Sequence, residues 1–415
     1  MSTRPTTNPR RRSLGFTLVE LMVAVALGML IMVALIAVYL NVSRTNSEMY
    51  KTNGLIENGR FAIDFLNEDL AHAGYWGGYV PQYDNFALRV APPDVPDAAS
   101  LALGPCAPYV SWTAAYRNML IGVPVEVFGD GTPTGCDTIT LIKDRKAGTD
   151  VLVVRHADTC SPGDTNCEAL DATKVYFQNS RCANETDAGL FYVLSRTQGD
   201  FVLKQRGCTG TPPAATTGTV APIRKFVSNI YYVRTWAVTA GDGIPTLVRA
   251  SFGPNGGTPA HEAPAQALIE GIEGFRVELG IDNQSRCGVA VNYGVAITSG
   301  AGGNLVDPAT CTYNAVTATA NTLPRLRGDG VPESYVRCPA TGCTVDQLRD
   351  VVAVKLFILS RSRDASANHS DTKTYTMGSA ATFTPSSSEA GFKRHLFQTT
   401  VRLTNISARR ETPAP

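Results

Sequence analysis

Charged residues are scarce in this sequence, and neither sign of charge dominates. Asp, Glu, Lys and Arg make up 18% of the 415 residues, and the formal net charge at pH 7 is +1. Recognition of nucleic acid needs a basic patch or stripe, which this balance does not indicate, so no nucleic-acid partner is predicted. The hydrophobic content of 44% is ample for one large domain or two smaller ones.

Catalytic signatures are missing as well. The sequence contains no H-E-x-x-H, no G-x-S-x-G, no Walker A loop and no G-x-G-x-x-G. Its five histidines are scattered along the chain: His72, His156, His261, His369 and His395. Nothing in the residue pattern favours a Ser or Cys triad. The sequence therefore predicts a protein that is not an enzyme and needs no cofactor.

Proline is absent from Phe16 to Ala73, although the whole chain has 25 prolines. Because a helix interior excludes proline, this stretch predicts one continuous helix that stops at Gly74. An apolar stripe with helical spacing marks its second half. The stripe consists of Leu55, Ala62, Leu66, Leu70 and Ala73. Gly54 and Gly59 are soft points that weaken the helix by about 1 kcal/mol each relative to Ala.

The first half of this helix, residues 16–40, is apolar apart from Glu20. Fourteen of its 25 residues are Leu, Ile, Val or Phe. They favour membrane insertion by roughly 6 kcal/mol, whereas one charge costs at most about 3 kcal/mol. The segment also exceeds the roughly 20 residues that span a bilayer core. Four arginines precede it and the next basic residue is Arg44, so the N-terminus is expected in the cytoplasm and the rest of the chain outside.

A plain membrane anchor does not need Glu20. A carboxylate inside a membrane is costly and is by default a functional residue; the alternative places it at the headgroup level, solvated and incidental. The run R-R-R-S-L-G-F-T-L-V-E from Arg10 to Glu20 resembles the class III signal of type IV prepilins and pseudopilins. The resemblance implies that a prepilin peptidase removes the leader, residues 1–15, by cutting between Gly15 and Phe16, and methylates the new amine of Phe16.

The spacing of this signal has a physical explanation. Cleavage leaves an ammonium group on Phe16, and an unpaired charge in hydrocarbon is expensive. Glu20 lies one helical turn further along, so its carboxylate can pair with the N-terminal amine of a neighbouring subunit. Such a pair would fix the axial stagger of helices that pack side by side in a filament core. Phe16, Thr17 and Glu20 are therefore the predicted assembly residues.

Further segments resemble the PilW-type minor pilins of type IV pili. These segments are ENGRFA at 57–62, AGY at 73–75, IEGFRVELGID at 272–282, DVVAVKLFILSRSR at 350–363 and FQTTVRLTN at 397–405. The resemblance implies an α+β, pilin-like fold. A long N-terminal helix over 16–74 would pack on a large antiparallel β-rich globular domain over 75–415, with a loop-rich insertion at about 283–344.

The resemblance also implies a function. The chain would be a structural subunit of a priming or tip complex of the type IV pilus, supporting pilus biogenesis, twitching motility and adhesion. Its implied partners are the prepilin peptidase, other minor pilins, the major pilin and the inner-membrane assembly platform. It would cross the inner membrane once, with its globular domain in the periplasm, and reach the cell surface in the pilus.

Two alternatives stay open at this point. The first is a minor pseudopilin of a type II secretion system, which would carry the same N-terminus. The second is a pilus-borne adhesin or glycan-binding module, in which the aromatic stretch Tyr231–Trp236 would form a sugar platform.

Strand signals fill the sequence after residue 75. Two hairpins are predicted, one from Thr138–Lys143 and Val151–Arg155, the other from Phe191–Ser195 and Phe201–Arg206. Further strands are expected at 226–238, 247–252, the second half of 268–281, 351–359 and 396–406, with a short helix at 345–350.

The ten cysteines all follow the membrane segment. Outside the cytoplasm an even number of cysteines predicts disulfides, and sequence neighbours are the natural partners. The candidate pairs are Cys160–Cys167, Cys182–Cys208, Cys287–Cys311 and Cys338–Cys343. A zinc site needs closely spaced pairs, and only the last of these comes near, so no metal is predicted.

Gly-Asp-Gly occurs three times, at 129–131, 241–243 and 328–330. Aspartates on tight turns can bind Ca²⁺, but a calcium loop needs several carboxylates at alternate positions. Asp329 has only Glu333 near it in sequence. The three motifs are therefore interpreted as turn tips.

Overall fold

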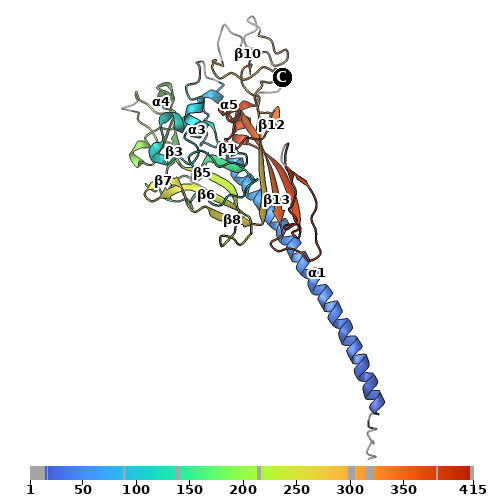
Figure 1. The fold of residues 1–415 in the computed structure, drawn as a ribbon. Coiled ribbons are helices and arrows are strands. Elements are labelled where there is room, and N and C mark those ends of the chain that lie inside the picture. The colour runs from blue at the N-terminus through green and yellow to red at the C-terminus, as the bar shows by residue number, and fades with distance from the viewer. Residues whose placement is uncertain are drawn as a thin grey trace, which may run out of the picture. The chain divides into compact units, whose positions relative to one another are not determined.

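The computed structural model describes residues 15, 17–86, 90–136, 140–212, 216–297, 304–313, 321–379 and 382–411. The chain divides into two compact units, Met1–Asn53 and Gly54–Pro415. Helix α1, Leu18–His72, contributes residues to both units and is drawn in blue in Figure 1.

The first unit contains the apolar part of α1. Every residue from Leu18 to Ser47 is exposed. Among the described residues, α1 is the one helix long and apolar enough to cross a membrane, with a mean hydropathy of 3.0 over its most apolar window and none of that window buried. Apolar side chains that the protein itself does not cover need lipid or other apolar helices around them.

In the second unit α1 presents one buried face to the globular domain. The face consists of Leu55, Gly59, Ala62, Leu66 and Leu70, and it contains most of the predicted apolar stripe. A Cβ atom on Gly59 would lie 2.0 Å from the ring of Phe397. Glycine at this position is therefore a requirement of close packing rather than a soft point. The helix ends at His72, and Gly74 follows in the left-handed region with φ of 71°.

The larger sheet has eight strands, all paired antiparallel. Its main path runs β1-β2-β5-β3-β4, and β6 joins β5 to β7 and β8. The strands are β1 Val125–Phe128, β2 Val151–Ala157, β3 Tyr176–Asn179, β4 Tyr192–Ser195, β5 Ile223–Arg234, β6 Thr246–Asn255, β7 Thr258–His261 and β8 Gln266–Glu270.

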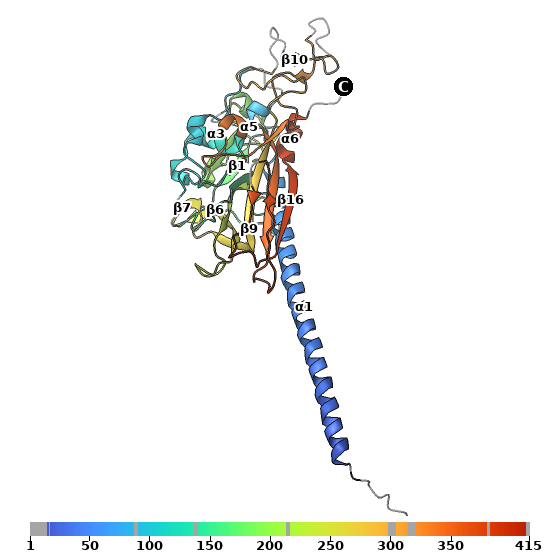
Figure 2. The ribbon, with the colours of Figure 1, turned by 45° about the vertical axis from the view of Figure 1, so that its right-hand side comes forward.

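The smaller sheet has four antiparallel strands in the order β12-β9-β13-β16. They are β12 Ser334–Val336, β9 Ile272–Ile281, β13 Val351–Arg361 and β16 Arg394–Arg402. β9 is buried along its whole length and β13 nearly so, as expected for the central strands, and β16 forms one edge. Figure 2 shows β9 and β16 beside the globular part of α1.

One hydrophobic cluster joins α1 to both sheets. It includes Leu66 of α1, Leu152 of β2, Val277 of β9 and Val354 of β13, all fully buried. The long N-terminal helix and the two antiparallel sheets thus share one hydrophobic core in the second unit. This confirms the predicted α+β fold class.

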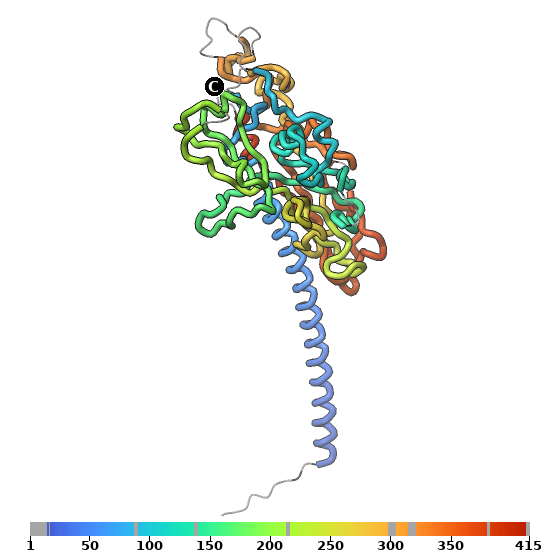
Figure 3. The backbone as a smooth tube through the Cα atoms, turned by 90° about the vertical axis from the view of Figure 1, so that its left-hand side faces the viewer, coloured from blue at the N-terminus to red at the C-terminus, as the bar shows by residue number. Residues whose placement is uncertain are grey.

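Short elements connect the strands. They are α2 Ala98–Leu101, α3 Ala114–Gly122, α4 Ala183–Asp187, α5 Val345–Arg349, α6 Thr404–Arg410, the 3₁₀ turns η1 Gln82–Asp84, η2 Tyr109–Ser111 and η3 Gln198–Asp200, and the two-residue strands β10 Leu305–Val306, β11 Leu323–Pro324, β14 Tyr375–Thr376 and β15 Thr382–Phe383. The segment around α4 and β3 lies on the opposite side of the domain from β13 in Figures 1 and 3.

Both predicted hairpins are wrong. The described part of Thr138–Lys143 forms turns, and β2 pairs with β1 and β5 instead. Leu141 and Ile142 are buried in a core cluster without joining the sheet, which explains why their apolar pattern resembled a strand. Phe201–Arg206 contributes one isolated bridge, and β4 pairs with β3.

The strand predicted at 396–406 is correct only in its first part. β16 ends at Arg402, and helix α6 follows. Leu403, Ile406 and Arg410 are all buried, and their spacings of three and four residues are helical. The strand at 351–359 and the helix at 345–350 are observed as β13 and α5.

Candidate assembly site and its supporting framework

Helix α1 begins with a reciprocal pair of hydrogen bonds between Thr17 and Glu20. The Thr17 backbone N–H donates to Glu20 Oε2 at 3.0 Å, and the Thr17 hydroxyl donates to the same oxygen at 2.9 Å. In return, the Glu20 backbone N–H donates to Thr17 Oγ1 at 3.3 Å. This is a capping box, which satisfies backbone donors at the helix start that have no partner within the helix.

The capping box occupies one carboxylate oxygen of Glu20. Within the part of the chain that the structure describes, Oε1 accepts no hydrogen bond, so Glu20 can cap its own helix and still offer an oxygen to a donor from outside. Gly15 is exposed. Phe16, predicted as the methylated residue and the assembly partner of Glu20, lies outside the described residues. The cleavage and pairing roles therefore remain predictions.

Asp69 attaches the C-terminal half of α1 to the larger sheet. Its carboxylate accepts hydrogen bonds from His156 Nε2 at 3.0 Å, from Asn229 Nδ2 at 3.1 Å and from the Tyr231 hydroxyl at 2.9 Å. His156 lies on β2, and Asn229 and Tyr231 lie on β5. One helix residue thus connects two strands. Sequence reasoning did not single out Asp69, because nothing in the sequence indicates which polar helix residue meets polar strand residues.

Burial and hydrogen bonding act on this group in opposite directions. Burial alone would raise the pKa of the Asp69 carboxyl, but the hydrogen bonds and the charge of His156 outweigh it, so its pKa lies below the ordinary value. Burial would likewise lower the pKa of His156, but Asp69 outweighs it and the pKa of His156 is raised. Asp69 and His156 therefore form a partly buried ion pair when both are charged.

The aromatic stretch at Tyr231–Trp236 is not a sugar platform. Tyr231 and Tyr232 are fully buried, and the Tyr232 hydroxyl donates to the Leu141 carbonyl at 2.9 Å. The Trp236 ring is covered by the guanidinium of Arg234, which lies 3.3 Å from the ring centroid. These side chains pack the domain, so the glycan-binding interpretation of this stretch is wrong.

The Gly-Asp-Gly motifs are part of turns. Asp242 accepts hydrogen bonds from the backbone N–H groups of Ala237, Val238, Thr239 and Ile244. These donors stabilise the charged form and hold the pKa of Asp242 far below its usual range, with the Ile244 bond the largest contribution. Asp130 has a positive φ of 54° and accepts from the Gly148 N–H at 2.6 Å.

The third motif, Gly-Asp-Gly at 328–330, contacts the carboxylate of Asp282, which the sequence did not indicate. Asp282, directly after β9, Asp329 and Glu333 each place one carboxylate oxygen within 4.8 Å of the other two. However, Asp282 already accepts from the N–H groups of Asp329 and Gly330, at 3.0 and 2.9 Å, and faces Arg410 at 3.7 Å. Burial raises the pKa of Asp282 to about 7. Donors of the protein itself thus satisfy the Asp282 carboxylate, and the geometry assigns no ion to it.

All ten cysteines form disulfides. The structure joins Cys160–Cys167, Cys182–Cys208, Cys287–Cys311 and Cys338–Cys343, the four neighbouring pairs, and also Cys106–Cys136, which was not paired from the sequence. Every thiol is consumed, so none can bind zinc.

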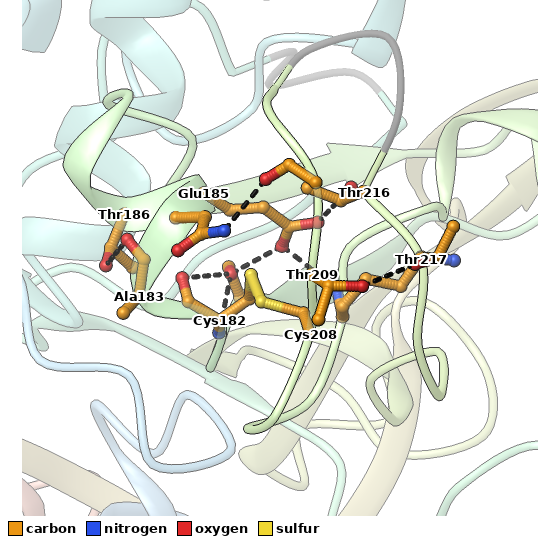
Figure 4. Close-up of a disulfide and its surroundings, with 12 residues drawn as sticks. Cys182, Ala183, Glu185, Thr186, Cys208, Thr209, Thr216 and Thr217 are labelled. Atoms are coloured by element: carbon orange, nitrogen blue, oxygen red, sulfur yellow. Dashed lines mark hydrogen bonds between the residues drawn. A yellow bond between two sulfur atoms is a disulfide. The ribbon is translucent and has the colours of Figure 1, made fainter.

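Figure 4 shows how the Cys182–Cys208 disulfide supports a buried carboxylate. Cys182 is fully buried. Beside it, Glu185 of α4 accepts from the Ser180 hydroxyl at 2.6 Å, the Lys204 N–H at 2.9 Å and the Thr216 hydroxyl at 2.8 Å. The disulfide and the Glu185 bonds together hold Lys204, Cys208 and Thr216 against α4.

Two family descriptions match parts of this chain. The family of type IV pilus-assembly protein W, PilW, matches residues 230–405, and the prokaryotic N-terminal methylation motif matches residues 10–36. No curated protein matches the chain. Among solved structures, the type IV-like pilin TTHA1219 from Thermus thermophilus matches at 10% identity and a TM-score of 0.24, covering 68% of this chain and 82% of that one.

The two family matches cover complementary parts of the chain. The methylation motif includes Thr17 and Glu20 with the start of α1, and the PilW match includes β9, β13 and β16, the strands that pack beside α1. The chain thus combines a PilW domain with a prepilin methylation motif, which marks it as a type IV minor pilin, a structural protein that its N-terminal helix anchors in the membrane before it enters the pilus.

Proposed function

We propose that this minor pilin belongs to a complex that primes pilus assembly and then occupies the pilus tip. Before assembly it crosses the inner membrane once through α1, with its N-terminus in the cytoplasm and its globular domain in the periplasm. Its partners are the prepilin peptidase, other minor pilins, the major pilin and the assembly platform of the inner membrane. The four arginines before α1 support this orientation.

The observation that carries the proposal is the hydrogen bonding of the Glu20 carboxylate. It is the only charged residue of the apolar segment, it holds one oxygen in its own capping box, and its other oxygen is open among the described residues. The capping box restrains the side chain, so Oε1 is presented in a defined direction. After the leader is removed, the ammonium of Phe16 on a neighbouring pilin is the donor whose charge matches.

Size supports the tip position. The second unit spans Gly54–Pro415 and contains two sheets of eight and four strands. A subunit inside a helical filament has to fit between identical neighbours on all sides, whereas a subunit at the tip has neighbours on one side only. A large domain is therefore easier to place at the tip.

The test is recovery of the intact protein with other pilins. Chemical crosslinking in cells that assemble pili, followed by purification and mass spectrometry, should give complexes with minor pilins and a mature N-terminus at methylated Phe16. Deletion should abolish surface fibres and twitching. A protein that starts at Met1, or a deletion that abolishes exoprotein secretion and leaves twitching intact, would contradict the proposal; the second result would indicate a pseudopilin.

A further inference from the structure

Strand β16 leaves one long side of the smaller sheet open. It pairs with β13 at nine consecutive positions, from Ala353–Arg402 to Arg361–Arg394, with no register shift. On its other side, alternate residues direct backbone N–H and C=O groups away from the sheet. Among the residues that the structure describes, none is bonded to a backbone group of β16 on that side.

The residue types on β16 do not protect this edge. Exposed edges are normally short, or carry charges, prolines or bulges that prevent pairing with another chain. Between Arg394 and Arg402 the sequence is HLFQTTV, and from Leu396 to Val401 it has no charge, no Pro and no Gly. The other edge of the same sheet, β12, has three residues. An uncharged six-residue strand of this kind is an aggregation hazard if it stays open.

Both faces of β16 make packing contacts, although Gln398, Thr400 and Arg402 on one face are exposed. The backbone edge is the part of the strand that no described element pairs with. On one face Phe397 contacts Gly59 of α1, and on the other Leu396 packs against the cluster of Phe357, Leu359 and Met377. Figure 2 shows β16 running alongside α1 at the margin of the sheet. A strand added here would extend the sheet beside the helix.

We propose that the β16 edge pairs with an extended segment of a neighbouring, different pilin subunit, which adds a strand to the smaller sheet. Main-chain hydrogen bonds would supply the affinity in this mode of recognition. The position of the edge selects the occupant. The proposed function brings other pilins alongside α1, and Phe397 of β16 lies against Gly59 of α1. The inference rests on the proposed function, because it needs the chain to have pilin neighbours.

A second copy of this chain is a poorer occupant. Two β16 strands related by a two-fold axis would pair antiparallel, and this would reverse the direction of the α1 segment beside them. Such a pair is closed by its own symmetry, whereas the subunits of a filament follow one another in one direction, so it does not fit a filament. A different pilin can place a strand of either direction against β16.

Photo-crosslinking in pilus-assembling cells tests the inference directly. A photoreactive amino acid is placed at Gln398, exposed on β16, and at Gln198, also exposed, in η3 beside the larger sheet. Position 398 should crosslink to a chain with the mass of another pilin, and position 198 should not. A product with the mass of two copies of this chain, or no product from 398 in protein recovered from pili, would overturn the proposal.

A matched pair of charge substitutions provides a second test of the inference. Gln398→Lys places a charge on the edge, whereas Gln198→Lys makes the same chemical change elsewhere. The first should lower recovery in sheared pili by about tenfold relative to total membranes, because a charge on an edge strand disfavours pairing with another strand. The second should leave recovery unchanged. Equal recovery of both variants would refute strand addition while leaving pilin function intact. Absence of the wild-type chain from pili would refute the proposed function as well.

Discussion

At the scale of single residues, the structure gives Glu20 a second role as part of a capping box, which the T-L-V-E spacing at residues 17–20 permits. A carboxylate four residues after the predicted cleavage site also caps its own helix through Thr17. The predicted pairing with a neighbour's Phe16 amine would use the other oxygen, so the two roles are compatible and can be separated experimentally. The role of Gly59 is likewise visible only in the structure, because its missing side chain leaves space for the ring of Phe397.

The role of Glu20 can be tested by removing its charge while keeping its shape. Glu20→Gln retains an oxygen for the capping box but cannot form an ion pair with a neighbour's Phe16 amine. Insertion and leader cleavage should persist, while incorporation should fail, because a buried pair broken on one side costs about 3–5 kcal/mol, more than a hundredfold in association. The variant is compared in total membranes and in sheared pili.

Thr17→Ala is the control for this experiment. It removes the cap, at a cost of about 1 kcal/mol to the helix, and leaves the Glu20 charge in place. Its incorporation should fall far less than that of Glu20→Gln, because the charge that pairs is kept and only the cap that orients it is lost. Equal recovery of Glu20→Gln in both fractions would mean that Glu20 is a tolerated charge at the headgroup level.

Gly59→Ala should destabilise the globular domain. The added methyl group overlaps the Phe397 ring, and overpacking of a core typically costs about 1–3 kcal/mol. Thermal unfolding of the full-length protein in detergent measures the change. Gly54→Ala is the matched control, since its Cβ meets nothing within 4 Å and should leave stability unchanged or raise it by up to about 1 kcal/mol. Gly59→Ala combined with Phe397→Leu should recover part of the loss.

At the scale of elements, the globular half of α1 is joined to β2 and β5 by a titratable contact. His156 and Asp69 stabilise each other's charged forms, in a site that would otherwise disfavour both charges. The attachment of the helix to the larger sheet therefore depends on pH. Its contact with the smaller sheet combines apolar packing with a buried hydrogen bond from the Ser360 hydroxyl to the Leu55 carbonyl, and neither of these groups titrates.

The sign of this pH dependence follows from the directions of the two pKa shifts. The pKa of His156 is raised above 6.5, so its contribution is complete below about pH 6.5 and is lost as the pH rises through the folded-state pKa. The pKa of Asp69 is lowered below 3.8, so its contribution is complete above about pH 4 and is lost in stronger acid. The pair stabilises most between these limits.

His156→Gln should remove the loss of stability that the wild-type protein shows as the pH rises through the pKa of His156. The difference in unfolding free energy between wild type and variant should be largest near pH 5–6 and shrink as the pH rises past the folded-state pKa of His156. Denaturant unfolding of the full-length protein in detergent across this pH range measures it. His395→Gln, at an exposed position of β16, should keep the wild-type profile. A difference independent of pH would argue against the ion pair.

At the scale of the whole molecule, disulfides stabilise the segments that the sheets do not include. The loops they close range from five residues for Cys338–Cys343 to 26 for Cys182–Cys208 and 30 for Cys106–Cys136. All lie in the second unit, in or beside irregular segments. An oxidising compartment is therefore part of the folding conditions of this protein.

Loss of the longer disulfide loops should cost more stability than loss of the shortest. On the chain-entropy view, a 26-residue loop contributes roughly 3.5 kcal/mol and a five-residue loop roughly 2 kcal/mol. Replacing Cys182 and Cys208 by Ser should therefore lower the unfolding free energy more than replacing Cys338 and Cys343. Denaturant unfolding under non-reducing conditions compares them. Free thiols detected in denatured, unreduced wild type would contradict the disulfide assignment itself.

The sequence by itself determined the features that depend on local pattern. The apolar run with Glu20, the absence of proline up to Ala73 and the helical stripe predict α1, and strong β patterns predict β2, β9 and β13. The prepilin signal and the PilW-like segments predict the family, which the family matches confirm. Each of these signals consists of residues close together in the chain, so periodicity and spacing are sufficient.

Only the tertiary structure decided how distant residues meet. The sequence does not show that Asp69 meets His156 and Tyr231, that Asp282 meets Asp329, or that Gly59 faces Phe397. It also mispaired Thr138–Lys143 with β2, because a buried apolar run has the same pattern inside or outside a sheet. Strand partners and buried polar contacts depend on which surfaces pack together, and that choice is made by the whole core rather than by any one segment.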